Sequence, residues 1–258
     1  MSWSYDAIAE VYATDMGRSM PFDDVAFYRG VASAQAGPTL ELGCGTGRIL
    51  LELLAAGVDA FGADRSLPML RRLRRDAAAR GLAAPRVLQM DLHALAIRAR
   101  FGCVLLPYSL LTYVTDVRAA AGLLAALRGN LAPRGIIVLD AFVPQPVASF
   151  ADFRLDYRRD HDSGERGSET LERHKRITAH ADGTNRIERR YRLYAPGADA
   201  PHDEFFTDET IRPYAADDLA RIVAAAGLRI ERWVYDYGTR EGAEGARFVS
   251  AIATDSAA

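Results

Sequence analysis

The chain has 258 residues, 49% of them hydrophobic, and its formal net charge at pH 7 is -2. This length predicts one large domain or a domain with an insertion, and the small net charge predicts no field that would draw the protein to nucleic acid or to an anionic membrane. The start lacks the basic and apolar pattern of a secretory signal, and no apolar run approaches the ~20 residues of a membrane span. The two cysteines, Cys44 and Cys103, are too few for a disulfide scaffold or a cysteine zinc site. We therefore expect a cytoplasmic protein with reduced thiols, no bound metal, no nucleic acid and no membrane contact.

Short apolar runs alternate with helical patterns from about residue 37 to 143. The pattern predicts strands over 39–42, 58–63, 86–90, 101–106 and 136–140, and helices over 48–56, 67–80 and 117–131. A stop signal, Leu131-Ala132-Pro133-Arg134-Gly135, separates the last helix from the last strand. Such alternation is typical of a parallel sheet covered on both faces, whose ligands bind beyond the carboxyl ends of the strands.

The spacing of the apolar residues changes after Phe142. Residues 150–212 alternate with period two, and Asp182-Gly183 stands between two strand-like arms, which predicts an antiparallel hairpin. A helix over 217–226 and strands over 228–235 and 247–253 then complete the first sheet. We interpret the alternating segment as an insertion that serves as a lid or a substrate-binding flap.

The stretch LELGCGTGRI carries glycines 43, 45 and 47 directly after the first predicted strand. A turn from a strand into a helix uses glycine where the backbone takes a positive φ or approaches a ligand closely. Glu41, at the carboxyl end of this strand, would repel a pyrophosphate but would favour a cationic ligand. Together with the glycine spacing, Glu41 disfavours an NAD-dependent oxidoreductase, which stays open as an alternative.

This stretch resembles the first motif of the class I S-adenosylmethionine-dependent methyltransferases, in particular those that act on small molecules. Asp64 matches the acidic residue of that family which holds the ribose hydroxyls, and Asp91-Leu92 matches the pair that contacts the adenine. The stop signal at 131–135 resembles the turn before the fifth strand of that family. The resemblance covers residues 37–143.

Two further stretches resemble the family outside this core. The start, Tyr5-Asp6-x-Ile8-Ala9-x-x-Tyr12, resembles the segment that covers the cofactor, and Arg212-Pro213-Tyr214 resembles the point where the chain re-enters the sheet. The resemblance implies an α/β, Rossmann-like class I methyltransferase fold: a mostly parallel seven-stranded sheet with an antiparallel insertion after strand five. The expected parts are N-terminal covering helices (1–36), the cofactor-binding core (37–149), the insertion, a substrate lid or dimer contact (150–212), and the completion of the core (213–258).

The resemblance implies an enzyme that transfers a methyl group from S-adenosylmethionine to a small-molecule acceptor. It assigns cofactor binding to Tyr5, Tyr12, Glu41, Gly43, Cys44, Gly45, Gly47, Asp64, Arg65, Met69, Asp91, Leu92, Pro107 and Tyr108. The expected catalytic residues are Tyr5, Tyr108 and Tyr113, and the expected substrate contacts are Asp140, Arg190, Arg212 and Tyr214. The exposed insertion would also support a homodimer.

The chain departs from the family at two places. Gly102 follows Phe101 where family members often have aspartate, and Leu106-Pro107-Tyr108-Ser109 lacks the side chain that accepts an amine proton in nucleobase methyltransferases. No histidine stands out as a general base, which favours methylation of an amine nitrogen over a hydroxyl. An O-methyltransferase and a non-catalytic regulator that binds the cofactor stay open as alternatives.

Overall fold

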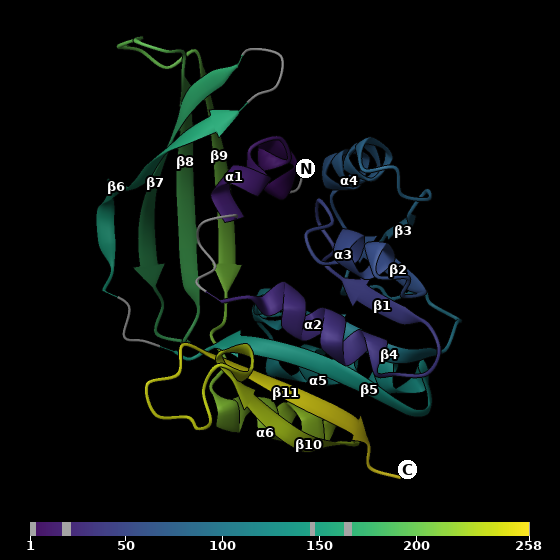
Figure 1. Cartoon of the computed structure of the whole chain (residues 1–258). Helices are drawn as coiled ribbons and strands as arrows, with labels where there is room; N and C mark the ends of the chain where they lie inside the picture. The colour runs from purple at the N-terminus through teal and green to yellow at the C-terminus, as the bar shows by residue number, and fades with distance from the viewer. Residues whose placement is uncertain (1–3, 17–21, 145–147, 163–166, 258) are drawn as a thin grey trace. The chain divides into compact units, whose positions relative to one another are not determined.

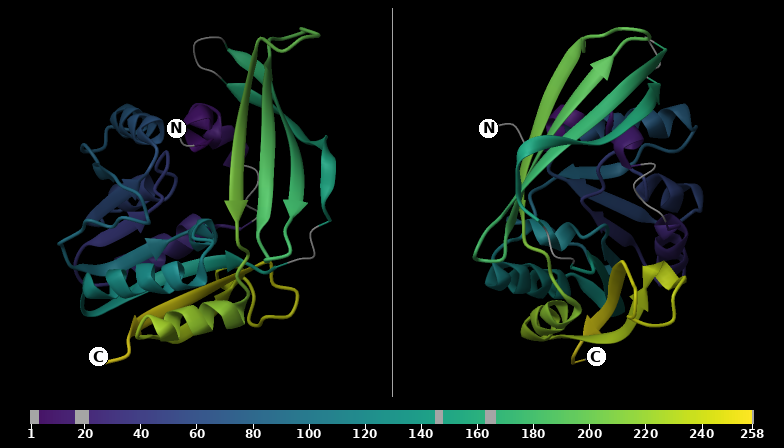
Figure 2. Two further views of the ribbon diagram at one scale, coloured as in Figure 1. Left: turned by 180° about the vertical axis from the view of Figure 1, so that it is seen from behind. Right: turned by 90° about the vertical axis from the view of Figure 1, so that its left-hand side faces the viewer.

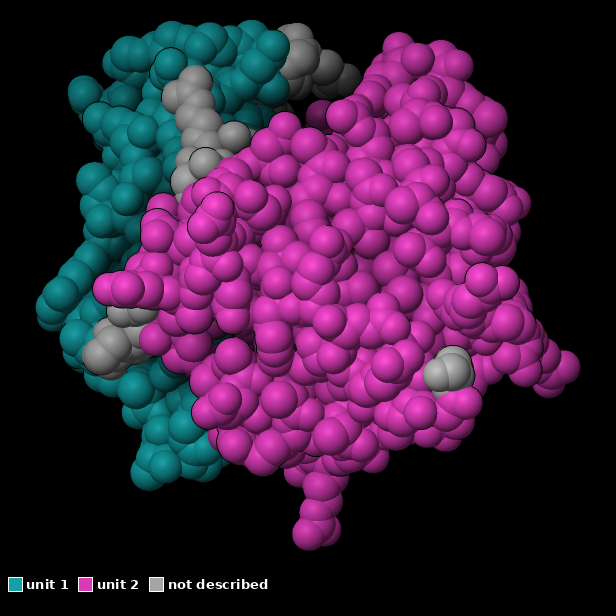
Figure 3. Space-filling view, turned by 60° about the horizontal axis from the view of Figure 1, so that its bottom comes forward, with its two compact units in different colours: residues 1–20, 145–211 teal, residues 21–144, 212–258 magenta. Residues whose placement is uncertain are grey.

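The computed structural model describes residues 4–16, 22–144, 148–162 and 167–257. Its contacts divide the chain into two compact units, each made of two segments (Figures 1 and 3). The insertion unit comprises residues 1–20 and 145–211, and the core unit comprises residues 21–144 and 212–258. The expected N-terminal part, 1–36, is therefore divided, because the helix α2 (Asp24–Ser33) belongs to the core unit.

The core unit contains a seven-stranded sheet of order β10-β11-β5-β4-β1-β2-β3. Its strands are β1 (Thr39–Leu42), β2 (Ala60–Asp64), β3 (Arg86–Gln89), β4 (Phe101–Leu106), β5 (Leu131–Phe142), β10 (Leu228–Tyr235) and β11 (Phe248–Asp255). The strands from β3 to β5 are parallel, whereas β11 pairs antiparallel with both β5 and β10. This confirms the predicted mostly parallel sheet of seven strands.

Helices cover both faces of this sheet (Figures 1 and 2). The helices α5 (Val117–Gly129) and α6 (Ala216–Ala225) cover one face of the sheet. The helices α2 and α3 (Leu50–Ala55) lie on the other face, and α4 (Leu67–Ala79) follows β2 in the chain. Three leucines of α5 face the sheet: Leu123, Leu124 and Leu127 join the main apolar cluster with Val104 and Leu139. This apolar burial is the main source of stability of the core unit.

The insertion unit is a four-stranded antiparallel sheet of order β6-β7-β8-β9 (Figure 2). Its strands are β6 (Phe150–Asp162), β7 (Ser168–Ala179), β8 (Asn185–Tyr194) and β9 (Asp203–Ile211). The predicted hairpin at Asp182-Gly183 joins β7 and β8; Gly183 has a φ of 84°, and the Asp182 carboxylate accepts the Thr184 N–H at 2.9 Å. The N-terminal 3-10 helix η1 (Ser4–Ile8) and the helix α1 (Tyr12–Met16) pack against this sheet.

Several observed bounds differ from the predicted ones by a few residues, and two of these differences have a clear physical reason. The strand β5 begins at Leu131 rather than at Ile136, because Leu131 already pairs with Phe101. The stop signal predicted at 131–135 corresponds to an irregular backbone at Arg134, whose φ is 62°. The helix α3 begins at Leu50 rather than at Arg48, because the glycine turn continues to that point. None of the helices in the described ranges is long and apolar enough to cross a membrane.

The structure explains the glycine that replaces the family's aspartate in β4. A Cβ atom at Gly102 would lie 1.8 Å from the carbonyl oxygen of Ala36, because the Gly102 N–H donates to the Pro38 carbonyl at 2.9 Å and the two segments run close together. Any side chain would force this backbone contact apart.

We predict that Gly102→Ala lowers the free energy of unfolding by about 2 kcal/mol or more, which urea unfolding can measure. The control is Gly122→Ala, the same change at a site in α5 where nothing lies within 4 Å of the added atom. This control should stabilise the protein by about 0.5–1 kcal/mol, as alanine does inside a helix. Equal effects of the two changes would contradict the close approach at Gly102.

Candidate active site

The turn after β1 has three positions that only glycine can occupy without strain. Gly43, Gly45 and Gly47 have φ angles of 65°, 53° and 90°, which L-residues other than glycine rarely adopt. A Cβ atom at Gly47 would lie 2.8 Å from Leu73 Cγ and 2.9 Å from Leu51 Cγ. The turn is thus packed between α3 and α4, and its backbone passes directly beyond the end of β1.

Asp64 connects this turn to the end of β2. Its two carboxylate oxygens accept the N–H groups of Gly45 at 2.8 Å and of Ser66 at 2.7 Å. The Ser66 hydroxyl in turn accepts the Met69 N–H at 3.3 Å and caps α4. The half-buried carboxylate is therefore held at the carboxyl end of the parallel strands, where the sequence places the ribose contact.

Glu41 is a buried carboxyl group next to the same turn. It is 2% exposed, and its Oε2 atom has no hydrogen-bond partner among the described residues. Burial raises the pKa of Glu41 to about 8, against the lowering effect of the Arg48 charge. Without a ligand this group is mostly neutral at pH 7, and a cation placed beside it would favour the ionised form. The glycine turn, Asp64 and this orphaned oxygen fit a cationic nucleoside ligand such as S-adenosylmethionine.

Asp91 lies after β3 and is already engaged as an acceptor. The backbone N–H and the ring Nδ1 of His93 both lie 2.9 Å from its carboxylate, and Arg65 lies 3.4 Å away. Partial burial opposes ionisation, but these hydrogen bonds and the Arg65 charge outweigh it and hold the pKa of Asp91 below its usual value. His93 is thereby a hydrogen-bond partner of Asp91.

The loop after β4 presents Tyr108 in an unusual backbone conformation. Tyr108 and Ser109 have φ angles of 53° and 57°, in the left-handed region that costs a non-glycine residue about 1–2 kcal/mol. The half-buried ring of Tyr108 lies 5.4 Å from the ring of Phe142 and 6.1 Å from that of Phe248. The guanidinium of Arg48, which forms two 2.6 Å bonds to Asp24, lies 6.0 Å from the Tyr108 ring centroid.

Arg212 and Tyr214 hold the segment that continues this loop. The Arg212 backbone N–H and Nε donate to the carbonyls of Thr112 and Thr115 at 2.8 and 2.5 Å, and the buried Tyr214 hydroxyl donates to the Val114 carbonyl at 2.5 Å. These polar groups support the backbone around Tyr113, which is half-buried in the 3-10 helix η2 (Leu110–Tyr113). Direct contact of Arg212 and Tyr214 with a substrate stays a prediction.

Asp140, near the end of β5, is fully buried and accepts three hydrogen bonds. Its Oδ1 accepts the Ser109 N–H, and its Oδ2 accepts the hydroxyls of Tyr28 and Tyr237, the latter at 2.6 Å. Burial raises the pKa of Asp140, although the hydroxyls of Tyr237 and Tyr28 and the backbone N–H groups of Ser109 and Tyr108 oppose the shift. Sequence reasoning singled out Asp140 as a substrate contact but missed both tyrosines, which follow no motif and lie 112 and 97 residues away in the chain.

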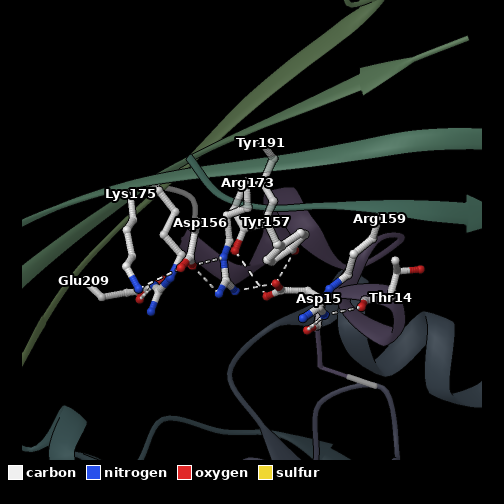
Figure 4. Close-up of polar contacts among 10 residues, drawn as sticks. Thr14, Asp15, Asp156, Tyr157, Arg159, Arg173, Lys175, Tyr191 and Glu209 are labelled. Atoms are coloured by element: carbon white, nitrogen blue, oxygen red, sulfur yellow. Dashed lines mark hydrogen bonds and ion pairs between the residues drawn. The ribbon is translucent and has the colours of Figure 1, made fainter. Parts of the chain in front are cut away.

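The insertion unit contains its own buried polar cluster (Figure 4). Asp15 of α1 accepts hydrogen bonds from Tyr157 and Arg173, and the Tyr191 hydroxyl lies 3.3 Å from it. Arg159 donates to the Asp15 carbonyl at 2.9 Å. The cluster joins α1 to one face of the sheet, and removing one member would leave buried charge without a partner.

Three of the predicted site residues lie in the insertion unit. The rings of Tyr5 and Tyr12 contact each other edge to face, with centroids 5.9 Å apart and an interplanar angle of 74°. Arg190 lies on the sheet face opposite the Asp15 cluster, with its guanidinium 5.0 Å from the Phe153 ring. The contribution of these residues to cofactor or substrate binding stays a prediction.

The remaining cofactor candidates lie on the core unit beside the glycine turn. Cys44 is buried, which raises the pKa of its thiol well above the usual value, and its N–H donates to the Ala63 carbonyl at 3.1 Å. Met69 and Pro107 are buried, and Leu92 is half-buried. The core unit thus brings together, at the carboxyl ends of β1 to β4, Glu41, Gly43, Cys44, Gly45, Gly47, Asp64, Arg65, Met69, Asp91, Leu92, Pro107 and Tyr108.

Comparison with known proteins agrees with this arrangement. Residues 39–135 match the sequence profile of a methyltransferase domain. The fold resembles that of the CcbJ methyltransferase from Streptomyces caelestis, with a TM-score of 0.81 and 22% identity over 98% of each chain. It also resembles the sugar N-methyltransferase KedS8 from Streptoalloteichus sp. ATCC 53650, with a TM-score of 0.70 and 21% identity over 99% of this chain and 94% of the other.

A third solved structure of this fold contains bound S-adenosylmethionine. It is CalS10, an amino pentose methyltransferase from Micromonospora echinaspora involved in calicheamicin biosynthesis, with a TM-score of 0.67 and 23% identity over 93% of this chain and 95% of the other. No curated protein matched the sequence. At these identities the structural likeness establishes the fold, and the profile match places a sequence similar to methyltransferase domains at residues 39–135.

We predict that Asp64→Ala weakens S-adenosylmethionine binding by about 2–4 kcal/mol, because two charge-assisted hydrogen bonds to the ribose would be lost. Isothermal titration calorimetry measures the change, and thermal unfolding verifies that the variant is folded. The control is Asp59→Ala, which removes an exposed carboxylate that pairs with Arg86. An unchanged dissociation constant for Asp64→Ala would contradict the ribose assignment.

We also predict that S-adenosylmethionine binds more tightly as the pH rises from about 6 to about 8, because ionisation of Glu41 becomes easier and the cation prefers the ionised carboxylate. Glu41→Gln keeps the shape but does not titrate, so its affinity should lack this increase. Both proteins are titrated in the same buffers, which cancels ionisation of the ligand's own amino group. Identical pH profiles would show that Glu41 does not face the cation.

Proposed function

We propose that this chain, a class I methyltransferase with S-adenosylmethionine as its methyl donor, methylates an amine nitrogen of a small molecule such as an amino sugar linked to a nucleotide. The observation that carries the choice of nitrogen is that three acidic or basic side chains of the core unit, Asp140, Asp24 and His93, are already engaged in hydrogen bonds or ion pairs. Asp140 already accepts three hydrogen bonds and Asp24 is paired with Arg48. His93, the only histidine within the sequence of the core unit, is bonded to Asp91.

A hydroxyl acceptor needs a general base, whereas a neutral amine already has a nucleophilic lone pair. The bound donor supplies an electrophilic methyl group on a sulfonium. The amine nitrogen forms a bond to the methyl carbon as the carbon–sulfur bond breaks, and the resulting ammonium group loses its proton to water. Alignment of the two reactants is then the protein's main contribution, which in favourable cases supplies about 7–11 kcal/mol.

The residues of the core unit are suited to binding and aligning the methyl donor. Glu41 would balance the positive charge of the donor, Asp64 would hold the ribose, and the aromatic face of Tyr108 suits a cationic sulfonium. The neighbours support the acceptor class, because KedS8 is a sugar N-methyltransferase and CalS10 is an amino pentose methyltransferase. The insertion would then contribute contacts to the acceptor, and we place the protein in the cytoplasm.

The test is a screen of paired acceptors. The protein is incubated with S-adenosylmethionine and with nucleotide-linked amino sugars, each matched by the sugar that has a hydroxyl in place of the amine. We expect S-adenosylhomocysteine to form with amines only, and mass spectrometry to find the new methyl group on nitrogen. Asp64→Ala serves as the control with weakened donor binding. Methylation of the hydroxyl partners would favour the O-methyltransferase alternative, and binding without any turnover would favour a regulator.

A further inference from the structure

Two strained dipeptides of the core unit meet at one buried carboxylate. Tyr108 and Ser109 have positive φ angles, and so do Asp236 and Tyr237, at 46° and 57°. The first pair follows β4 and the second follows β10, so they are far apart in the sequence. Asp140 is 0% exposed and accepts one hydrogen bond from each pair: the N–H of Ser109 and the hydroxyl of Tyr237.

Neither strained pair is a flexible surface turn. Ser109 is buried, and its hydroxyl accepts the Phe142 N–H at 2.8 Å. Asp236 is also buried, and its carboxylate accepts the N–H groups of Arg247 and Phe248 at 2.8 and 2.9 Å. Left-handed backbone at residues with large side chains persists only where the surroundings fix it, and it clusters at functional sites. Glycine would adopt either conformation without strain, so the side chains at these positions are required for another reason.

Tyr108 and Tyr237, the two tyrosines of these turns, belong to one aromatic cluster. The Tyr237 ring contacts those of Phe27, Tyr28 and Phe248 at centroid distances of 5.7, 6.0 and 5.3 Å. Phe248 then contacts Tyr108 at 6.1 Å. The carboxylate therefore holds the backbone next to Tyr108 directly, and it holds the aromatic packing beneath Tyr108 through Tyr28 and Tyr237.

We propose that Asp140 is a positioning residue, whose buried carboxylate fixes the left-handed Tyr108–Ser109 turn and thereby the Tyr108 ring at the methyl-transfer site. This inference rests on the proposed function for the role of Tyr108, and it gives Asp140 a part other than direct substrate contact. Asp140 acts through the Ser109 N–H, the Tyr28 hydroxyl and the Tyr237 hydroxyl. It needs no access to the acceptor, which agrees with its complete burial.

The test compares Asp140→Ala with the double variant Tyr28→Phe and Tyr237→Phe, which removes two donors but keeps both rings. We expect S-adenosylmethionine binding to weaken by no more than about tenfold in each variant, because the glycine turn and Asp64 are untouched and only the contact of the Tyr108 ring with the sulfonium would change. We expect kcat with an amine acceptor to fall at least about tenfold, because a small displacement of a positioning group is costly. Thr254→Val is the control, since it removes another buried hydroxyl bond, to the Gly135 carbonyl.

Crystal structures of the variants give a readout that does not depend on an acceptor. We expect Tyr108 and Ser109 to leave the left-handed region and the Tyr108 ring to move in Asp140→Ala. If that variant does not fold, the double tyrosine variant carries the same test, with displacement of the Tyr108 ring as its readout. An unchanged turn and ring, or an unchanged kcat with only a lower melting temperature, would overturn the proposal. If no acceptor is methylated, the proposed function fails, while the position of Tyr108 still decides the role of Asp140.

Discussion

The close packing of the turn between β1 and α3 is the constraint on which the rest of the core unit depends. A side chain at Gly47 would collide with Leu51 and Leu73, so the turn must pass within contact distance of both neighbouring helices. That path places the Gly45 N–H against the Asp64 carboxylate and leaves the buried Glu41 beside the turn. One backbone path thus fixes two acidic groups in different environments. Asp64 is half-buried and accepts two hydrogen bonds, whereas Glu41 is buried and its Oε2 atom has no hydrogen-bond partner among the described residues.

This difference in environment matters for the chemistry of a cationic donor. Asp64 can accept hydrogen bonds from neutral hydroxyls, whereas the elevated pKa of Glu41 makes its charge depend on whether a cation is present. Further along the sheet, Asp140 is also buried, and burial raises its pKa, but hydrogen-bond donors surround its carboxyl group and oppose this shift. In the proposed function, Asp64 would contact the ligand, Glu41 would balance its charge, and Asp140 would hold the structure around Tyr108.

The parts of the fold with local signals were predictable from the sequence. The bounds of β1, β4 and β10 are those expected from the apolar runs, and Asp182-Gly183 marked its hairpin. The glycine turn was expected from the strand that precedes it. Asp64 and Asp91 were assigned through the family resemblance, and both directly follow predicted strands. The hydrogen bonds from Tyr28 and Tyr237 to Asp140 were not predictable, because they join distant segments through side chains that form no motif. The division of the N-terminal segment between two units was missed for the same reason: α1 is tied to the insertion by Asp15, whose partners are over 140 residues away.

The proposed function depends on binding of S-adenosylmethionine by the glycine turn and its two acidic partners, Glu41 and Asp64. Calorimetric titration of the wild-type protein with S-adenosylmethionine, and separately with S-adenosylhomocysteine, tests this binding. We expect micromolar binding of both ligands, with one site per chain, because the turn, Asp64 and Asp91 would contact parts that the two ligands share. Absence of binding for both would contradict it, and would mean that this chain keeps the fold of the methyltransferases without their cofactor site.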